Sequence, residues 1–272
     1  MICFPNAKIN LGLHVTGKRP DGYHNIETVF YPVPLRDALE VVRADQPSFT
    51  QCGILPDVAP ENNLVMKALH ALKEKHLLPS PAVYLKKNIP PGAGLGGGSA
   101  DAAFMLKLLN TFAGLHLDDA ELEEIAAGIG ADCPFFIRNK PVLATGTGNV
   151  FESLPLSLKG YTLYIVKPDA SVSTREAYRH VNPSKPARPL REIISRPVTE
   201  WREALTNDFE ESIFARCPVI GEIKNRLYAE GALYASMSGS GSSVFGLFRT
   251  DKPLRFPGCF VWKGMLEQES LN

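Results

Sequence analysis

The segment from Pro90 to Ala103 constrains this chain more than any other part of its sequence. Five glycines stand within the seven residues 92–98, and a helical pattern of Ala, Met and Leu follows directly. Because glycine has no Cβ, it lets backbone N–H groups converge on one point and lets a ligand approach them. A helix N-terminus adds free N–H donors, and we expect Ser99 to cap it. The segment therefore predicts a phosphate-binding loop.

Other interpretations of this loop fit less well. The signature of P-loop NTPases needs a lysine directly before its Ser or Thr, but Gly98 precedes Ser99 here. A dinucleotide fingerprint, GxGxxG, can be read across 92–97, and it would indicate a nicotinamide-dependent dehydrogenase. That fingerprint should follow a hydrophobic strand directly, whereas Pro90 and Pro91 intervene. A plain flexible turn needs only one or two glycines.

The composition argues against several classes of protein. The 272 residues carry no net charge at pH 7 and no basic cluster, unlike a nucleic-acid binder or a membrane-surface protein. No apolar run approaches the roughly 20 residues of a membrane span, and no secretory signal is expected. The five cysteines are scattered without Cys-x-x-Cys spacing, which is typical of a reduced, cytoplasmic protein. We expect a monomer or a weak homodimer that binds small molecules.

Hydrophobic periodicity predicts an α+β fold. Apolar residues alternate from Ala7 to Val15, as in a half-buried strand, with Lys8 and Asn10 on the face opposite the apolar one. Further strands are expected at 26–31, 39–42, 83–86, 134–137, 142–144, 162–166, 233–235, 244–248 and 260–263. Helices are expected at 63–75, after the glycine loop to about 112, at 118–128 with a capping box, at 200–205 and at 219–230. The elements interleave without a regular βαβ period, which predicts two domains, 1–153 and 154–272.

Three smaller motifs have ordinary structural explanations when each is taken alone. Asp132 stands in a small-residue loop, Gly130–Phe136, where an acid usually caps or turns the chain. His24 ends a turn-like Asp-Gly-Tyr-His element and is more often structural than catalytic. The segment Ser236–Ser243 is rich in glycine and serine, but its apolar flanks predict a buried hairpin-like loop rather than a linker.

Taken together, these motifs resemble those of the GHMP kinases, in the 4-diphosphocytidyl-2-C-methyl-D-erythritol kinase branch. The resemblance runs in order through Pro5–Leu11 with Gly17–His24, then Gly92–Ala103, then Gly130–Asp132 with Pro134 and Phe136, and then Met237–Gly241. The glycine loop specifies only the superfamily, whereas the Asp-Gly-Tyr-His element beside Ala-Lys-x-Asn is specific to this branch. The least family-like part is 181–197, a loop or irregular helical excursion whose role the resemblance leaves unassigned.

The resemblance implies a two-domain GHMP kinase fold with its active site in the cleft between the domains. It implies transfer of the ATP γ-phosphoryl group to the 2-hydroxyl of 4-diphosphocytidyl-2-C-methyl-D-erythritol, in the non-mevalonate isoprenoid pathway. Asp132 would be the catalytic base, and Lys8 would pair with it or with the phosphate. Magnesium should accompany ATP; its ligands stay unassigned, with Ser99 as one candidate.

The remaining site residues also follow from the resemblance. ATP binding is implied for Asn63, Lys87, Pro90, Pro91, Gly92, Ala93, Gly94, Leu95, Gly96, Gly97, Gly98, Ser99 and Ala100. Binding of the acceptor substrate is implied for Asn10, Tyr23, His24, Thr174, Tyr178, Ser238 and Gly239. The rings of Tyr23 and Tyr178 would stack on cytosine, while the His24 backbone would contact its edge.

Two further alternatives stay open. Another GHMP kinase, acting on homoserine, mevalonate or a sugar, would share the glycine loop but would not need the Asp-Gly-Tyr-His element. A non-catalytic sensor of a nucleotide or sugar would not need Lys8 and Asp132.

Overall fold

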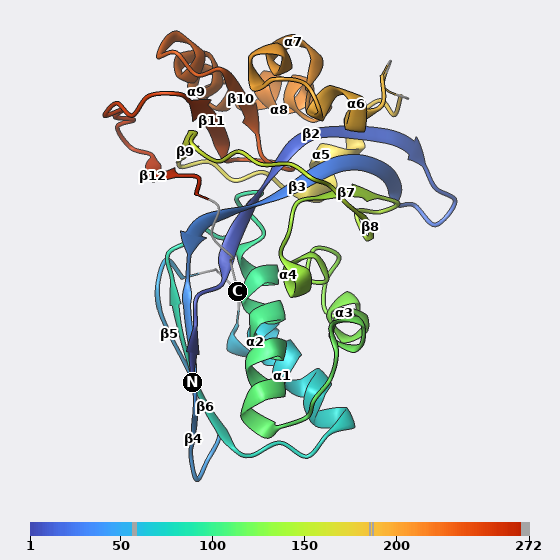
Figure 1. Ribbon diagram of the computed structural model, residues 1–272, viewed down its shortest axis with the longest axis vertical. Helices are drawn as coiled ribbons and strands as arrows, with labels where there is room; N and C mark the ends of the chain where they lie inside the picture. The colour runs from blue at the N-terminus through green and yellow to red at the C-terminus, as the bar shows by residue number, and fades with distance from the viewer. Residues whose placement is uncertain (56–58, 185, 187, 268–272) are drawn as a thin grey trace. The chain divides into compact units, whose positions relative to one another are not determined.

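The computed structural model describes residues 1–55, 59–184, 186 and 188–267 (Figure 1). The chain forms two compact units, and neither unit is a single segment. The first unit holds residues 1–7, 35–91 and 96–140, and the second holds 8–34, 92–95 and the described residues from 141 onward. The long strands β2 (Asn6–Lys18) and β3 (His24–Arg36) each carry the chain from one unit to the other. The domain boundary between residues 153 and 154, expected from the sequence, stays a prediction.

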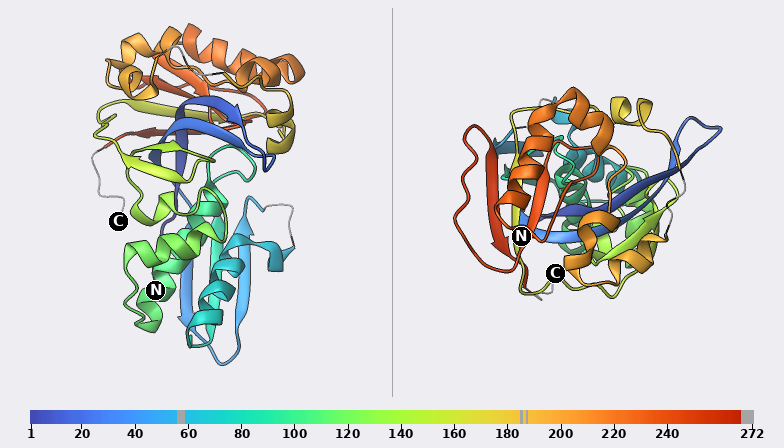
Figure 2. Two further views of the ribbon diagram at one scale, coloured as in Figure 1. Left: turned by 90° about the vertical axis from the view of Figure 1, so that its right-hand side faces the viewer. Right: turned by 90° about the horizontal axis from the view of Figure 1, so that it is seen from above.

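The first unit is a four-stranded sheet with helices packed on it (Figures 1 and 2). Its strand order is β1 (Ile2–Cys3), β4 (Ala38–Arg43), β6 (Pro81–Lys87) and β5 (Ser48–Gly53), and β5 and β6 run parallel. Its helices are η1 (Pro60–Asn62), α1 (Leu64–Lys75), α2 (Gly97–Ala113), α3 (Asp119–Ala127) and α4 (Phe135–Arg138). Helix α2 packs against α1 and β4, and its Ala, Met and Leu side chains are buried. The helix that follows the glycine loop thus forms the centre of this core.

The second unit contains two four-stranded sheets. One has the order β2, β3, β7 (Val142–Thr145) and β8 (Val150–Ser153); the other has β10 (Tyr234–Met237), β11 (Val244–Phe248), β9 (Thr162–Lys167) and β12 (Phe260–Met265). Its helices are α5 (Thr174–Arg179), α6 (Leu190–Ile194), η2 (Val198–Glu200), α7 (Trp201–Ala204), α8 (Glu210–Arg216) and α9 (Pro218–Ala229). Helix α9 packs against β10 and β11. This arrangement confirms the α+β class.

Local signals predicted several elements well. Asp118 and Glu121 form the expected capping box of α3, with both hydrogen bonds at 2.9 Å. The segment Ser236–Ser243 is the expected buried hairpin-like loop, since Met237 pairs with Val244 across antiparallel strands. Helix α2 ends at Ala113, close to the expected end at about residue 112.

Three expectations were wrong. The predicted strand at 134–137 is the start of α4, because Pro134 has helical dihedral angles and begins a helical turn. Ser99 does not cap α2; Gly96 occupies that position, and Ser99 lies in the first turn. Strand β2 is not half-buried, since Lys8 and Asn10 are only 4% and 2% exposed. Burial of these polar groups is tolerated because they are hydrogen-bonded to neighbouring residues.

A buried ion network ties β6 to α2 in the first unit. The Lys87 ammonium contacts Asp37 and lies 2.6 Å from Asp101 Oδ2. Asp37 also accepts hydrogen bonds from the backbone N–H groups of Asn88 and Ile89. Burial, together with the charge of Asp37, raises the pKa of Asp101 well above its usual range, although Lys87 opposes this shift. One ammonium therefore contacts two buried carboxyl groups, and the raised pKa favours the neutral form of Asp101.

Replacing Lys87 should destabilise the protein strongly. Lys87→Met leaves the buried carboxyl groups of Asp37 and Asp101 without their cation, and breaking a buried ion pair in this way costs about 3–5 kcal/mol. Lys86→Met is the matched control, because Lys86 is the neighbouring lysine on β6 and is exposed. Urea unfolding of both variants measures the difference; equal stabilities would show that the network contributes little.

Candidate active site

The glycine loop contains three glycines in a backbone conformation that residues with a side chain rarely adopt. Gly92, Gly94 and Gly96 have φ angles of 61°, 76° and 70°, in the left-handed region. Helix α2 begins directly after Gly96, and no side chain caps its first N–H groups. Uncapped N–H groups and the helix dipole together attract an anion. The residues 96–100 belong to the first unit and 92–95 to the second.

In the second unit, the glycine loop is held by the segment Ser238–Ser243, called here the serine-glycine loop. The Ser238 hydroxyl donates a hydrogen bond to the Gly94 carbonyl at 2.8 Å, and the Ser243 N–H donates to the Ala93 carbonyl at 3.2 Å. A Cβ on Gly94 would lie only 1.9 Å from the Ser238 carbonyl oxygen. The two loops can therefore approach this closely only with glycine at position 94.

Strand β2 brings two further predicted residues to the same place. The Lys8 N–H donates to the Leu95 carbonyl at 2.9 Å, and the Lys8 ammonium donates to Asn10 Oδ1 at 2.6 Å. The Asn10 N–H in turn lies 3.3 Å from the Ser238 hydroxyl, which accepts from it. The structure thus brings Lys8, Asn10, Gly94 and Ser238 together.

An aromatic group lies on the second unit as well. The rings of His24 and Tyr178 are stacked with centroids 5.0 Å apart, and Tyr178 also contacts Phe209 edge-on at 4.8 Å. The Tyr23 side chain is accessible, since the residue is 67% exposed. Thr174, at the start of α5, lies 3.0 Å from Ser240 of the serine-glycine loop, hydroxyl to hydroxyl. These residues could present flat apolar surfaces to a base, and their contact with a substrate remains a prediction.

The first unit holds the other predicted residues. Asn63 caps α1 by accepting a hydrogen bond from the Val65 N–H at 2.9 Å, and it donates to Gln51 at 2.8 Å. Lys87 belongs to the buried ion network. Both side chains therefore have structural roles, and their contacts with a nucleotide stay predictions.

Asp132 lies close to the start of α2. It is partly buried in the turn before α4, and its neighbour Cys133 is hydrogen-bonded to the Ser99 side chain. Burial raises the pKa of Cys133 to about 11, so this thiol stays neutral and is no nucleophile at pH 7. Lys8 belongs to the second unit and Asp132 to the first, so their pairing stays a prediction.

Sequence reasoning missed several residues that support these loops. Asp37 and Asp101, the partners of Lys87, and Asn207 and Glu210, described below, were not singled out. The only local signal was Asp101, an acid within an otherwise apolar helical pattern.

Two further features bear on metal and membrane binding. Within the described ranges, no three His, Cys, Asp or Glu side chains are placed to hold a metal ion together. None of the helices in those ranges has both the length and the apolar character needed to cross a membrane.

Comparisons with known proteins identify the family of this chain. Models of the N-terminal and C-terminal domains of GHMP kinases match residues 63–140 and 190–255. A Parabacteroides distasonis protein named 4-diphosphocytidyl-2-C-methyl-D-erythritol kinase is 63% identical, covering 98% of this chain and 100% of that protein. A protein of the same name from Bacteroides thetaiotaomicron is 60% identical, covering 93% of this chain and 94% of its own length.

Two solved structures are similar to this chain. A crystal structure of 4-(cytidine 5'-diphospho)-2C-methyl-D-erythritol kinase matches with a TM-score of 0.77 at 34% identity, covering 91% of this chain and 90% of that one. A homoserine kinase from Cytophaga hutchinsonii shares the fold alone, with a TM-score of 0.68 at 17% identity over 97% and 95% of the two chains. The chain belongs to the GHMP kinases, in the family of 4-diphosphocytidyl-2-C-methyl-D-erythritol kinases.

Proposed function

We propose that this chain transfers the γ-phosphoryl group of ATP to the 2-hydroxyl of 4-diphosphocytidyl-2-C-methyl-D-erythritol, in the non-mevalonate (methylerythritol phosphate) pathway. The observation that carries the proposal is the contact of the glycine loop with the serine-glycine loop beside the buried Lys8–Asn10 pair. The names of relatives that match nearly the whole chain support the choice of acceptor. A cytoplasmic location and a monomeric or weakly homodimeric state are parts of the same proposal.

The glycine loop would hold the phosphates of ATP. Phosphoryl transfer depends mainly on positioning and on neutralising the charge of the transferred group. The uncapped N–H groups at the start of α2 supply donors that need no rearrangement during the reaction. The left-handed glycines leave room for the phosphates beside the backbone.

Asp132 and Lys8 would carry the chemical step. Asp132 accepts the proton of the acceptor hydroxyl as that oxygen bonds to the γ-phosphorus, and the bond from the γ-phosphorus to the bridging oxygen of ADP breaks. The Lys8 ammonium stabilises the negative charge on the transferred group and pairs with Asp132. Asn10 accepts a hydrogen bond from Lys8 and so fixes the direction of its ammonium.

Magnesium would bind mainly through ATP. In kinases this ion is held by phosphate oxygens, water and one or two protein groups, so it does not need a preformed cluster of carboxylates. The described residues fit that mode, since they hold no such cluster and the Ser99 hydroxyl lies in the first turn of α2. The ion would neutralise charge on the β- and γ-phosphates.

The aromatic residues also support the choice of acceptor. Tyr23 is exposed, and Tyr178 is held by His24 and Phe209, so both rings could stack on a cytosine base. Stacking of a base on an aromatic side chain is worth on the order of 1–3 kcal/mol. Homoserine or mevalonate would gain nothing from this group.

Turnover should depend on the cytidine-linked acceptor. We expect the purified protein to convert ATP to ADP with 4-diphosphocytidyl-2-C-methyl-D-erythritol but not with mevalonate, homoserine or galactose. A coupled ADP assay with each acceptor, and with NAD as a control for dehydrogenase activity, measures this. Equal turnover with mevalonate or homoserine would refute the choice of acceptor while leaving the kinase assignment intact.

Asp132→Asn and Lys8→Ala should each abolish most turnover while leaving binding of the acceptor nearly unchanged. A group that acts only in the transition state contributes to rate rather than to ground-state binding, and a general base is worth roughly 10²–10⁴-fold. Steady-state kinetics with a parallel binding titration measures both quantities. Lys159→Ala is the control, because Lys159 is an exposed lysine that lies outside all of these motifs. Near-normal turnover of Asp132→Asn would refute the mechanism.

A further inference from the structure

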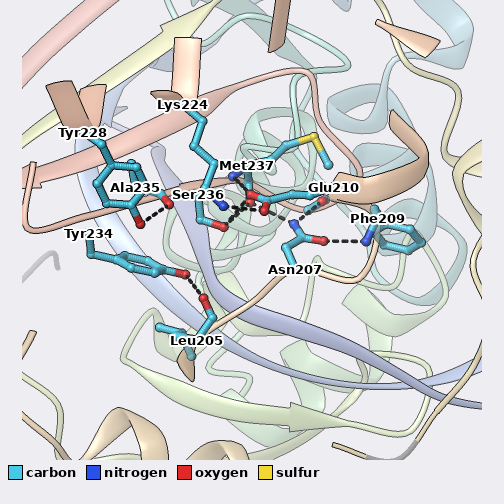
Figure 3. A network of polar contacts seen from close by, with 11 residues as sticks. Leu205, Asn207, Phe209, Glu210, Lys224, Tyr228, Tyr234, Ala235, Ser236 and Met237 are labelled. Carbon is cyan, nitrogen blue, oxygen red and sulfur yellow. Dashed lines mark hydrogen bonds and ion pairs between the residues drawn. The ribbon is translucent and has the colours of Figure 1, made fainter. Parts of the chain in front are cut away.

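Four consecutive residues, Asn207–Glu210, contact four different parts of the second unit. This stretch, called here the anchor segment, lies between α7 and the first turn of α8. Figure 3 shows Asn207 and Glu210 pointing toward the end of β10, where the serine-glycine loop begins. None of the motifs in the sequence includes this segment.

Asn207 holds the serine-glycine loop through its side-chain amide. Its Nδ2 donates to the carbonyls of Met237 and Gly239, both at 2.9 Å, and its Oδ1 accepts from the Phe209 N–H at 3.0 Å. The residue is 4% exposed, so water does not compete for these bonds. The two carbonyls flank Ser238, and fixing them therefore fixes the residue that donates to Gly94.

Glu210 holds the strand that leads into the same loop. Its Oε1 accepts from the Met237 N–H at 2.8 Å and from the Ser236 hydroxyl at 3.1 Å (Figure 3). Its Oε2 lies 2.5 Å from the Lys224 ammonium on α9, which balances its charge. Hydrogen bonds to a charged group are stronger than neutral ones, so the start of the loop is held firmly.

The two middle residues of the anchor segment contact the other parts of the site. The Asp208 N–H donates to the Leu13 carbonyl at 2.9 Å, and Asp208 Oδ2 accepts from the Val15 N–H at 2.8 Å, which ties the segment to β2. Phe209 packs edge-on against Tyr178. The anchor segment thus fixes three parts of the second unit: strand β2, which carries Lys8, the aromatic group and the serine-glycine loop.

We propose that Asn207 is a positioning residue for nucleotide binding, acting through Ser238 and Gly94. A loop of serines and glycines has many conformations when free. The two hydrogen bonds from Asn207 select the one in which Ser238 donates to the Gly94 carbonyl, and so the phosphate-binding conformation of the glycine loop. This inference rests on the proposed function, because it takes the glycine loop to be the ATP site.

Asn207→Asp tests the proposal by changing a single side-chain atom. The carboxylate still accepts from the Phe209 N–H, but it cannot donate and places a negative oxygen against two carbonyls. We expect the dissociation constant of a non-hydrolysable ATP analogue to rise on the order of tenfold. The affinity should recover partly as the pH is lowered, because a protonated carboxyl regains one donor. Asn207→Ala should also lose affinity for the analogue, but this affinity should not recover at lower pH.

Asn110→Asp is the matched control. Asn110 near the end of α2 donates to the Leu117 carbonyl at 2.9 Å and accepts from its N–H at 3.0 Å, so the same change breaks the same kind of bond in the first unit. We expect it to bind the analogue as the unmodified protein does. Circular dichroism checks the folding of each variant.

Ser238→Ala provides a second test that does not depend on the stability of the Asn207 variants. Ser238→Ala removes the hydrogen bond to the Gly94 carbonyl and should reproduce the loss of affinity for the analogue. The double variant should bind the analogue scarcely more weakly than the single variant with the lower affinity. Analogue affinity equal to that of the unmodified protein in either Asn207→Asp or Ser238→Ala would overturn the proposal. The titration contains no acceptor, so an unmodified protein that binds the analogue but does not phosphorylate the cytidine-linked alcohol would refute only the choice of acceptor.

Discussion

The backbone of Gly94 approaches the Ser238 carbonyl so closely that no side chain fits between them, and the candidate site depends on this contact. It joins two loops that are more than a hundred residues apart in the sequence, and the Ser238 hydroxyl closes it with a hydrogen bond. The same hydroxyl accepts from the backbone of β2, which places the Lys8–Asn10 pair beside the glycine loop. The glycines therefore do more than give the loop freedom: one of them allows two backbones to pack together.

Each unit contains a buried ion pair, and each ion pair fixes a part of the site. In the first unit Lys87 pairs with Asp37 and Asp101, which ties the strand before the glycine loop to the N-terminal half of α2. In the second unit Lys224 balances Glu210 at the start of the serine-glycine loop. Burial makes an uncompensated charge costly, so these networks resist rearrangement. A kinase benefits from this rigidity because its catalysis depends on donors that are already in place.

Local signals in the sequence predicted much of the fold. The alternation along β2, the capping box at Asp118 and the apolar run of α2 are short-range patterns, and all three elements are present. The error at 134–137 arose because a four-residue apolar run fits a strand or a helix equally well. The burial of Lys8, the partners of Lys87 and the role of Asn207 depend on residues distant in the sequence, so no local pattern could show them. The resemblance to GHMP kinases supplied the roles of Asp132 and Tyr23, which remain predictions.

The most direct test of this account is a titration of Gly94→Ala with a non-hydrolysable ATP analogue. Gly114→Ala is its control, because both glycines have positive φ angles, 76° and 64°, but a Cβ on Gly114 meets no atom within 4 Å. The two variants thus share backbone strain and differ in the clash with Ser238. We predict that Gly94→Ala stays folded and loses analogue binding, while Gly114→Ala binds normally. Normal binding by Gly94→Ala would contradict the claim that this close contact shapes the phosphate site.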